Sequence, residues 1–148
     1  MNDSTVDSIV WHRVTRIRIL VVDDHELVRR QLCRVLAAQP DLDVVCEAAD
    51  GEGAIRRAGE LQPDVILLDI GLPGLDGFTA ARHIHDVAPS AEILFVSQHD
   101  TAQMAREALR AGGRGYVAKV DIVNDLVPAV HAVSQRKQYI RRRLAGRL

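Results

Sequence analysis

Apolar residues along the chain fall into two kinds of segment. Five short, almost continuous runs rich in Val, Ile and Leu are typical of parallel β-strands that are buried on both faces. These runs occupy residues 17–22, 42–48, 64–68, 91–96 and 115–118. Apolar residues recur at helical spacing in five longer segments, which predicts amphipathic helices. These segments occupy residues 25–38, 52–61, 78–87, 101–110 and 122–133.

The alternation of strands and helices predicts the fold. Right-handed β-α-β connections place helices on both faces of a parallel sheet. We therefore predict a flavodoxin-like, doubly wound α/β fold with a five-stranded parallel sheet in the order 2-1-3-4-5 and five helices. The last helical pattern contains Pro128, where we expect the helix to begin late or to kink. We place the domain at residues 17–134, after an N-terminal extension over residues 1–16 and before a basic tail or linker over residues 135–148.

Polar side chains follow four of the five predicted strands. Because the carboxyl ends of parallel strands meet at one edge of the sheet, these side chains are expected to lie together beside the switch point between strands one and three. A loop rich in glycine and proline, residues 71–77, keeps the edge open after strand three. The converging residues are Asp23 and Asp24 from strand one, Asp69 from strand three, Ser97 from strand four and Lys119 from strand five.

Three carboxylates at one edge predict a cation site. Their mutual repulsion requires either raised pKa values or a bound cation, and Mg²⁺ suits a set of carboxylate and carbonyl oxygens best. Lys119 adds a positive charge and Ser97 a hydroxyl, so the edge is suited to hold a phosphoryl group. Asp69 faces the open loop, which makes it the expected nucleophile for an acyl phosphate.

Composition limits the alternatives. A chain of 148 residues that is 47% hydrophobic is long enough for one domain with a real core, and the 3% aromatic content means that this core is aliphatic. The net charge of −1 excludes a global field that attracts nucleic acid or membrane. No signal-peptide or membrane-spanning pattern is present, so we expect a cytoplasmic protein with reduced Cys33 and Cys46 and no membrane partner.

Four motifs carry a resemblance to a known family. They are Val21-Val22-Asp23-Asp24-His25, Asp64-Val65-Ile66-Leu67-Leu68-Asp69 with Leu72-Pro73-Gly74-Leu75-Asp76-Gly77, Val96-Ser97, and Gly115-Tyr116-Val117-Ala118-Lys119. In this order and spacing the sequence resembles the receiver domain of two-component response regulators over residues 17–133. The end of the chain resembles the linker of NarL/LuxR-type regulators. No helix-turn-helix output domain follows, so we expect a stand-alone receiver or a fragment of a longer regulator.

The resemblance assigns roles to the residues at this edge. Asp69 would accept a phosphoryl group from a sensor histidine kinase, in a signalling domain that assists its own phosphorylation and dephosphorylation and is not a separate enzyme. Lys119 would bridge to the phosphoryl oxygens, and Ser97 with Tyr116 would form a switch pair. A second copy of the chain is a further candidate partner, and DNA would be reached only through an output domain. The implied Mg²⁺ ligands are Asp23, Asp24, Asp69 and the carbonyl of Gly71.

Two residues depart from the family pattern. Val120 stands where the family usually has proline, so we expect a trans peptide bond after Lys119. Gln98 is larger than the residue usual after the switch hydroxyl and could crowd or shield the phosphoryl pocket. These departures keep open a pseudo-receiver that binds partners without phosphorylation. A phosphatase of the haloacid-dehalogenase type is disfavoured, because Gly71 stands where that chemistry needs a second aspartate.

Simpler explanations stand beside several of these roles. Asp23 and Asp24 could cap the first helix, and Tyr116 could be a half-buried cover. The arginine-rich C-terminal segment could bind a nucleic-acid backbone, but a solvated helix end or linker is favoured. Five histidines lack metal-ligand spacing and are expected at the surface or at helix caps. They are His25, His83, His85, His99 and His131.

Overall fold

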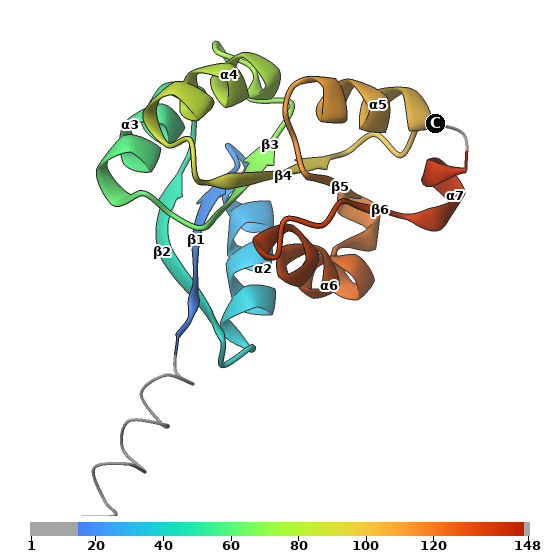
Figure 1. The fold of residues 1–148 in the computed structure, drawn as a ribbon, viewed down its shortest axis with the longest axis horizontal. Helices are drawn as coiled ribbons and strands as arrows, with labels where there is room; N and C mark the ends of the chain where they lie inside the picture. Colours follow the sequence, from blue (N-terminus) through green and yellow to red (C-terminus); the bar gives the residue numbers. More distant parts are fainter. Residues whose placement is uncertain (1–14, 147–148) are drawn as a thin grey trace, which may run out of the picture.

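The computed structural model describes residues 15–146, so most of the predicted N-terminal extension, with Trp11, lies outside the described residues. Six parallel strands form one sheet in the order β2-β1-β3-β4-β5-β6 (Figure 1). This confirms the predicted order 2-1-3-4-5 and adds a short sixth strand at the edge. The strands are β1 (Ile17–Val22), β2 (Leu42–Ala48), β3 (Val65–Asp69), β4 (Glu92–Ser97), β5 (Gly115–Ala118) and β6 (Tyr139–Ile140).

Helices cover both faces of the sheet, with α3, α4 and α5 on one face and α2 and α6 on the other (Figure 1). The five predicted helices are confirmed, and two short turns are added: the 3-10 helix η1 (Lys119–Asp121) and α7 (Arg142–Ala145). The last long helix begins at Ile122 and continues through Pro128, so it does not begin late. The long helices are α2 (Glu26–Ala37), α3 (Gly51–Leu61), α4 (Gly77–Val87), α5 (Ala102–Arg110) and α6 (Ile122–Ser134).

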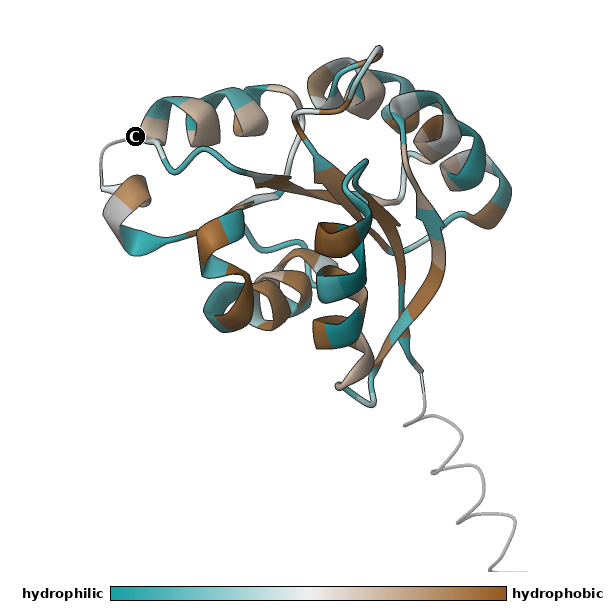
Figure 2. Cartoon of the chain, turned by 180° about the vertical axis from the view of Figure 1, so that it is seen from behind, coloured by the Kyte–Doolittle hydropathy of each residue, from teal (hydrophilic) through white to brown (hydrophobic). Residues whose placement is uncertain are grey.

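The core consists of two aliphatic layers separated by the sheet. In β3, Ile66 and Leu68 pack into the layer under α3, α4 and α5, whereas Val65 and Leu67 pack into the layer under α2 and α6. Every residue of β3 is buried, which explains its unbroken apolar run. Figure 2 shows the same pattern, with hydrophobic strands inside and hydrophilic helix surfaces outside. None of the described helices is long and apolar enough to cross a membrane.

Side-chain caps fix the start of three helices. The Asp50 carboxylate accepts a hydrogen bond from the Gly53 amide at 2.7 Å at the start of α3. Asp76 accepts from the Thr79 amide at 2.9 Å at the start of α4. Thr101 caps α5 in the same way. Each cap satisfies an amide that the helix itself leaves without an acceptor, and so fixes where the preceding loop ends.

The C-terminal segment packs on the open edge of the sheet. Strand β6 pairs in parallel with β5, and Leu144 of α7 is buried in the layer under α5. Arg141 donates two hydrogen bonds, of 2.8 and 3.0 Å, to the nearly buried carboxylate of Asp125 in α6. Arg141 therefore belongs to a neutralised pair. The predicted domain boundary at residue 134 stays a prediction.

Glycine is required where α4 approaches β3, and this gives a stability prediction. A Cβ atom at Gly77 would lie 2.4 Å from the Asp69 carbonyl oxygen and 2.7 Å from the Ile70 Cα atom. Because both are backbone atoms that cannot rotate away, Gly77→Ala is expected to lower the free energy of unfolding by about 1–3 kcal/mol or more. Urea denaturation followed by circular dichroism measures this change.

Gly59→Ala is the matched control. A Cβ atom there would lie 3.5 Å from the Val87 Cβ atom, an ordinary contact, in the interior of α3. Alanine is the better helix former, so this change is expected to raise the free energy of unfolding by about 0.5–1 kcal/mol. Effects of the same sign at both positions would contradict this account of α4 packing.

Candidate functional site

The candidate site lies at the carboxyl edge of the sheet, beside the switch point between β1 and β3. Strand register brings the ends of the central strands level: Val22 pairs with Leu68, Asp69 with Val96, and Ser97 with Ala118. The residue that ends or follows each strand is therefore delivered to the same place. The sequence predicted this convergence, and the structure places Asp23, Asp69, Ser97 and Lys119 within it.

A largely buried ammonium group joins two carboxylates at the centre of this edge. Lys119 Nζ lies 3.0 Å from Asp23 Oδ2 and 3.4 Å from Asp69 Oδ2. Asp23 is fully buried, and the Asp69 and Lys119 side chains are 5% and 11% exposed. Removing one partner of a buried ion pair leaves an uncompensated charge, so the three side chains constrain one another's positions.

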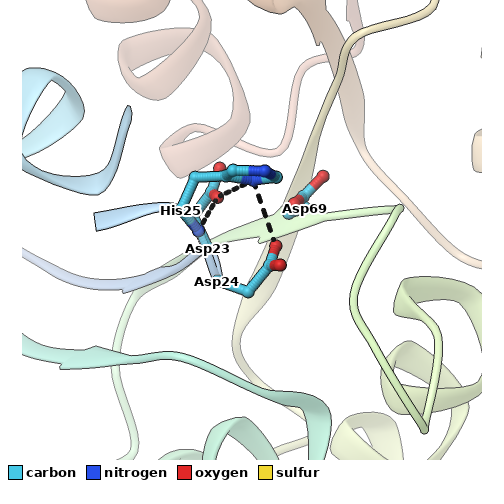
Figure 3. A group of neighbouring side chains, drawn as sticks. All are labelled: Asp23, Asp24, His25 and Asp69. Carbon is cyan, nitrogen blue, oxygen red and sulfur yellow. Dashed lines mark hydrogen bonds and ion pairs between the residues drawn. The ribbon is translucent and has the colours of Figure 1, made fainter. Parts of the chain in front are cut away.

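Asp24 and His25 complete a cluster at the mouth of the site (Figure 3). His25 Nδ1 lies 3.4 Å from Asp24 Oδ1 and 3.6 Å from Asp23 Oδ1. One ligand atom from each of Asp23, Asp24, His25 and Asp69 lies within 4.8 Å of the others. The sequence predicted His25 at the surface or at a helix cap. It is the exposed N-cap residue of α2, but its ring lies beside the carboxylates. Its position directly after Asp23-Asp24 was the signal that could have identified it.

Backbone amides orient two of the carboxylates. The amide of His25 donates to Asp23 Oδ1 at 2.9 Å, so Asp23 also supports the turn into α2. The amide of Gly71 donates to Asp69 Oδ1 at 3.1 Å. Each bond leaves the second oxygen of the carboxylate facing Lys119. Gly71 lines the pocket beside Asp69, and the role of its carbonyl as a metal ligand stays a prediction.

The proposed switch residues meet at the backbone of His99. Ser97 Oγ accepts a hydrogen bond from the His99 amide at 3.1 Å, and the Tyr116 hydroxyl donates to the His99 carbonyl. Tyr116 is fully buried rather than a half-buried cover. Burial raises the pKa of Tyr116, and a contact with Ser97 opposes this shift. The Ser97 hydroxyl and the Tyr116 side chain are thus linked through His99, in the loop that precedes α5.

A pocket of about 140 Å³ opens beside these groups, which is room for several water molecules or one phosphoryl group. Gln98 lines this pocket but is exposed, so it lies at the rim and does not fill the interior. The peptide bond after Lys119 is trans, as are all described peptide bonds, which agrees with the prediction from Val120. The lining residues are His25, Asp69, Ile70, Gly71, Ser97, Gln98, His99, Met104 and Lys119.

The electrostatics of the pocket fit a divalent cation. Burial raises the pKa of Asp69, the neighbouring Asp23 raises it further, and Lys119 opposes the shift. Asp23 Oδ2 and Asp24 Oδ1 are buried and accept no hydrogen bond from a described residue. Three carboxylates against one ammonium leave an excess of negative charge, which oxygen-seeking cations such as Mg²⁺ neutralise. The donor set therefore fits the predicted metal.

Sequence comparison supports this interpretation of the edge. A profile of the response regulator receiver domain matches residues 19–131. The chain is 36% identical over 125 residues to transcriptional regulatory protein DegU of Brevibacillus brevis, covering 84% of this chain and 53% of DegU. It is 34% identical over 132 residues to transcriptional regulatory protein LiaR of Bacillus subtilis, covering 89% of this chain and 63% of LiaR. The chain thus spans between half and two thirds of these relatives.

Solved structures of response regulators are also similar to this chain. A two-component response regulator of the LuxR family from Aurantimonas sp. SI85-9A1 superposes with a TM-score of 0.84 at 36% identity, over 89% of this chain and 94% of that one. The signal receiver domain of the putative response regulator NarL from Mycobacterium tuberculosis superposes with a TM-score of 0.70 at 31% identity, over 79% of this chain and 98% of that one.

The raised pKa of Asp69 predicts a pH-dependent gain in stability when its charge is removed. A raised pKa means that the folded state binds the proton more tightly than the unfolded state. The resulting stabilisation is complete below the unfolded pKa and is lost as the pH rises through the folded pKa. Without divalent cations, Asp69→Asn is therefore expected to raise the melting temperature at pH 7. The gain should shrink as the pH falls toward about 4, the ordinary pKa of aspartate.

Asp86→Asn serves as the control for this measurement, because Asp86 is an exposed carboxylate on α4. Its melting temperature should follow that of the wild type across the pH range. Differential scanning calorimetry gives the comparison. An Asp69→Asn gain of the same size at pH 7 and pH 4 would show that its cause is not the charge.

Proposed function

Because the chain belongs to the response regulator receiver domain family, we propose that Asp69 accepts a phosphoryl group from a sensor histidine kinase in the presence of Mg²⁺. A receiver domain is a signalling module rather than a conventional enzyme, and a histidine kinase is the partner that the family implies. The observation that carries the proposal is the Lys119 ammonium shared by Asp23 and Asp69 beside an open pocket.

In the proposed reaction, Asp69 is the nucleophile. One of its carboxylate oxygens attacks the phosphorus atom while the bond from phosphorus to the kinase imidazole nitrogen breaks, and the released imidazole takes up a proton. Lys119 lies close enough to Asp69 to contact the incoming phosphoryl oxygens. Ser97 lines the same pocket and supplies a hydroxyl. The protein contributes position and charge, which account for most catalysis of phosphoryl transfer.

Asp23, Asp24, Asp69 and the Gly71 carbonyl would hold the cation. When bound, Mg²⁺ supplies positive charge to the phosphoryl oxygens. The buried oxygens of Asp23 and Asp24 that accept no hydrogen bond from the described residues support this assignment. Asp23 also holds Lys119, so the same residue positions both sources of positive charge.

Ser97 and Tyr116 would transmit the change in charge. Both now bond to the backbone of His99, one to the amide and one to the carbonyl. If Ser97 Oγ turns toward a phosphoryl group on Asp69, it releases the His99 amide, and the loop that carries the Tyr116 acceptor is free to move. The surface that responds would be the start of α5 and the exposed part of the loop before it.

The relatives named as transcriptional regulators suggest the biological output. We infer that the domain controls transcription within a longer regulator, where DNA would be bound by a separate output domain. A second copy of the domain is the other expected partner. Val120 and Gln98 motivate the alternative of a pseudo-receiver, but Gln98 leaves the pocket open. Phosphorylation of Asp69 separates a phosphoacceptor from a pseudo-receiver.

Phosphorylation by a small donor tests the proposal. Incubation with acetyl phosphate and Mg²⁺ is expected to add one phosphoryl group to the wild-type protein, seen by intact mass spectrometry. Chelation of Mg²⁺ and the Asp69→Asn variant should each abolish the addition. A folded protein that binds Mg²⁺ but gains no phosphoryl group would support the pseudo-receiver instead.

Lys119→Met separates phosphoryl binding from cation binding. The change removes the ammonium beside Asp69 but keeps every proposed metal ligand. Loss of one preorganised group of this kind costs roughly 100-fold in rate. We therefore expect phosphorylation by acetyl phosphate to slow by about that factor, while Mg²⁺ affinity, measured by calorimetric titration, is kept or increased. Unchanged phosphorylation would show that Lys119 has only a structural role.

A further inference from the structure

The imidazole of His25 lies within the cluster of candidate metal ligands, although the proposed function uses only oxygen atoms there. Its Nδ1 atom is 3.4 Å from Asp24 Oδ1 and 3.6 Å from Asp23 Oδ1 (Figure 3). The ligand atoms of Asp23, Asp24, His25 and Asp69 all lie within 4.8 Å of one another. A nitrogen donor among three carboxylates changes which cations the site prefers.

These separations suit one coordination sphere. With bonds of about 2.1 Å, neighbouring ligands of an octahedral ion are about 3.0 Å apart and opposite ligands about 4.2 Å apart. The separations of 3.4 and 3.6 Å between His25 and the two carboxylates fall between these values. All four ligand atoms lie within 4.8 Å of one another, a limit above the spacing of opposite ligands, so the side chains would rotate to bring all four residues onto one ion.

The backbone holds His25 in this position. Its amide donates to Asp23 Oδ1, and its carbonyl accepts the first hydrogen bond of α2, from the Arg29 amide at 2.9 Å. The Arg29 side chain also donates to the Asp23 carbonyl at 2.8 Å. Only the two side-chain torsions of His25 stay free. Binding an ion there requires little ordering of the backbone.

Buried carboxylate oxygens without a hydrogen bond from the described residues point to a ligand beside this imidazole. Asp23 is fully buried, yet its Oδ2 atom accepts no hydrogen bond from the described residues and has only the ion pair with Lys119. Asp24 Oδ1, the atom nearest to His25 Nδ1, is also buried without a hydrogen bond from that part of the chain. Such oxygens are costly unless a cation binds them, and the Lys119 ammonium offsets this cost at Asp23 but is not paired with Asp24.

We propose that His25 is a further ligand of this metal centre, which would give the site a preference for nitrogen-binding divalent transition ions, represented by Co²⁺, over Mg²⁺. The proposal rests on the proposed function, because it concerns the same acidic site. Imidazole binds Co²⁺, Ni²⁺ and Zn²⁺ well, whereas Mg²⁺ takes oxygen ligands and keeps several waters. His25 therefore adds affinity for the first group and almost none for Mg²⁺.

Titration of the full chain with Co²⁺ alone and Mg²⁺ alone tests the proposal. His25→Ala is expected to weaken Co²⁺ binding by about tenfold or more and Mg²⁺ binding by less than twofold. His83→Ala is the control, since His83 is an exposed histidine on α4 and is not in the ligand cluster. It should leave the ratio of the two affinities unchanged. The exposed His25 side chain makes a folded variant the expected result, and circular dichroism checks it.

Proton NMR of the Co²⁺ form gives a second, direct readout. Ring protons of a histidine bound to Co²⁺ are shifted far outside the normal range by the unpaired electrons. These signals should be present in the wild type and in His83→Ala and absent from His25→Ala. An unchanged ratio of Co²⁺ to Mg²⁺ affinity in His25→Ala, or shifted ring signals that persist in it, would overturn the proposal.

Phosphorylation separates this proposal from the proposed function. If acetyl phosphate modifies Asp69 with Mg²⁺ while His25→Ala keeps the wild-type affinity ratio, only the ligand role of His25 is wrong. If His25→Ala loses Co²⁺ affinity but Asp69 is not modified with Mg²⁺ or Co²⁺, the metal ligand is supported and the phosphoacceptor function is wrong.

Discussion

The ion pairs of Lys119 with Asp23 and Asp69 set the electrostatic cost that the carboxyl edge of the sheet has to meet. Charges removed from water interact strongly, and a carboxylate without a partner there is costly. The sheet meets this cost because its two aliphatic layers fix the strand ends without help from the site. β3 is buried along its whole length and presents Asp69 only at its last residue. The stable part of the fold thus holds an edge that is electrostatically unfavourable without added positive charge.

Strand β5 connects this edge to the rest of the molecule. Lys119 follows its last residue, Tyr116 lies within it, and β6 pairs along its outer side. Lys119 also begins η1, which leads directly into α6. At that junction Asp121 and Asp125 pair with Arg141 from the C-terminal segment. One short stretch of chain therefore carries the Lys119 ammonium and the buried Tyr116 ring and pairs with the last strand, β6. A displacement of Lys119 would therefore be felt by the Tyr116 ring, by β6 and by the start of α6.

The sequence predicted most of this because its signals are local. The apolar runs of β1, β2 and β5 predicted the observed bounds, and the polar residues that follow the strands located the site. The missed features depend on long-range contacts. β6 has two residues and α7 has four, too few to show a period, and they are held by β5, Leu144 and Arg141. The burial of Tyr116 and the orientation of the His25 ring likewise depend on neighbours that no pattern in the sequence reveals.

Charge balance links the proton, the cation and the phosphoryl group at this edge. Protonation of Asp69 and cation binding both reduce the same excess of negative charge. Each therefore lowers the affinity of the site for the other. The proposed phosphorylation of Asp69 would act in the opposite direction, because an acyl phosphate carries more negative charge than the carboxylate it replaces. The ammonium of Lys119 and the hydroxyl of Ser97 are the movable groups near enough to respond. Since Ser97 holds the His99 amide and Tyr116 holds its carbonyl, a response to added charge reaches the loop before α5 through one residue.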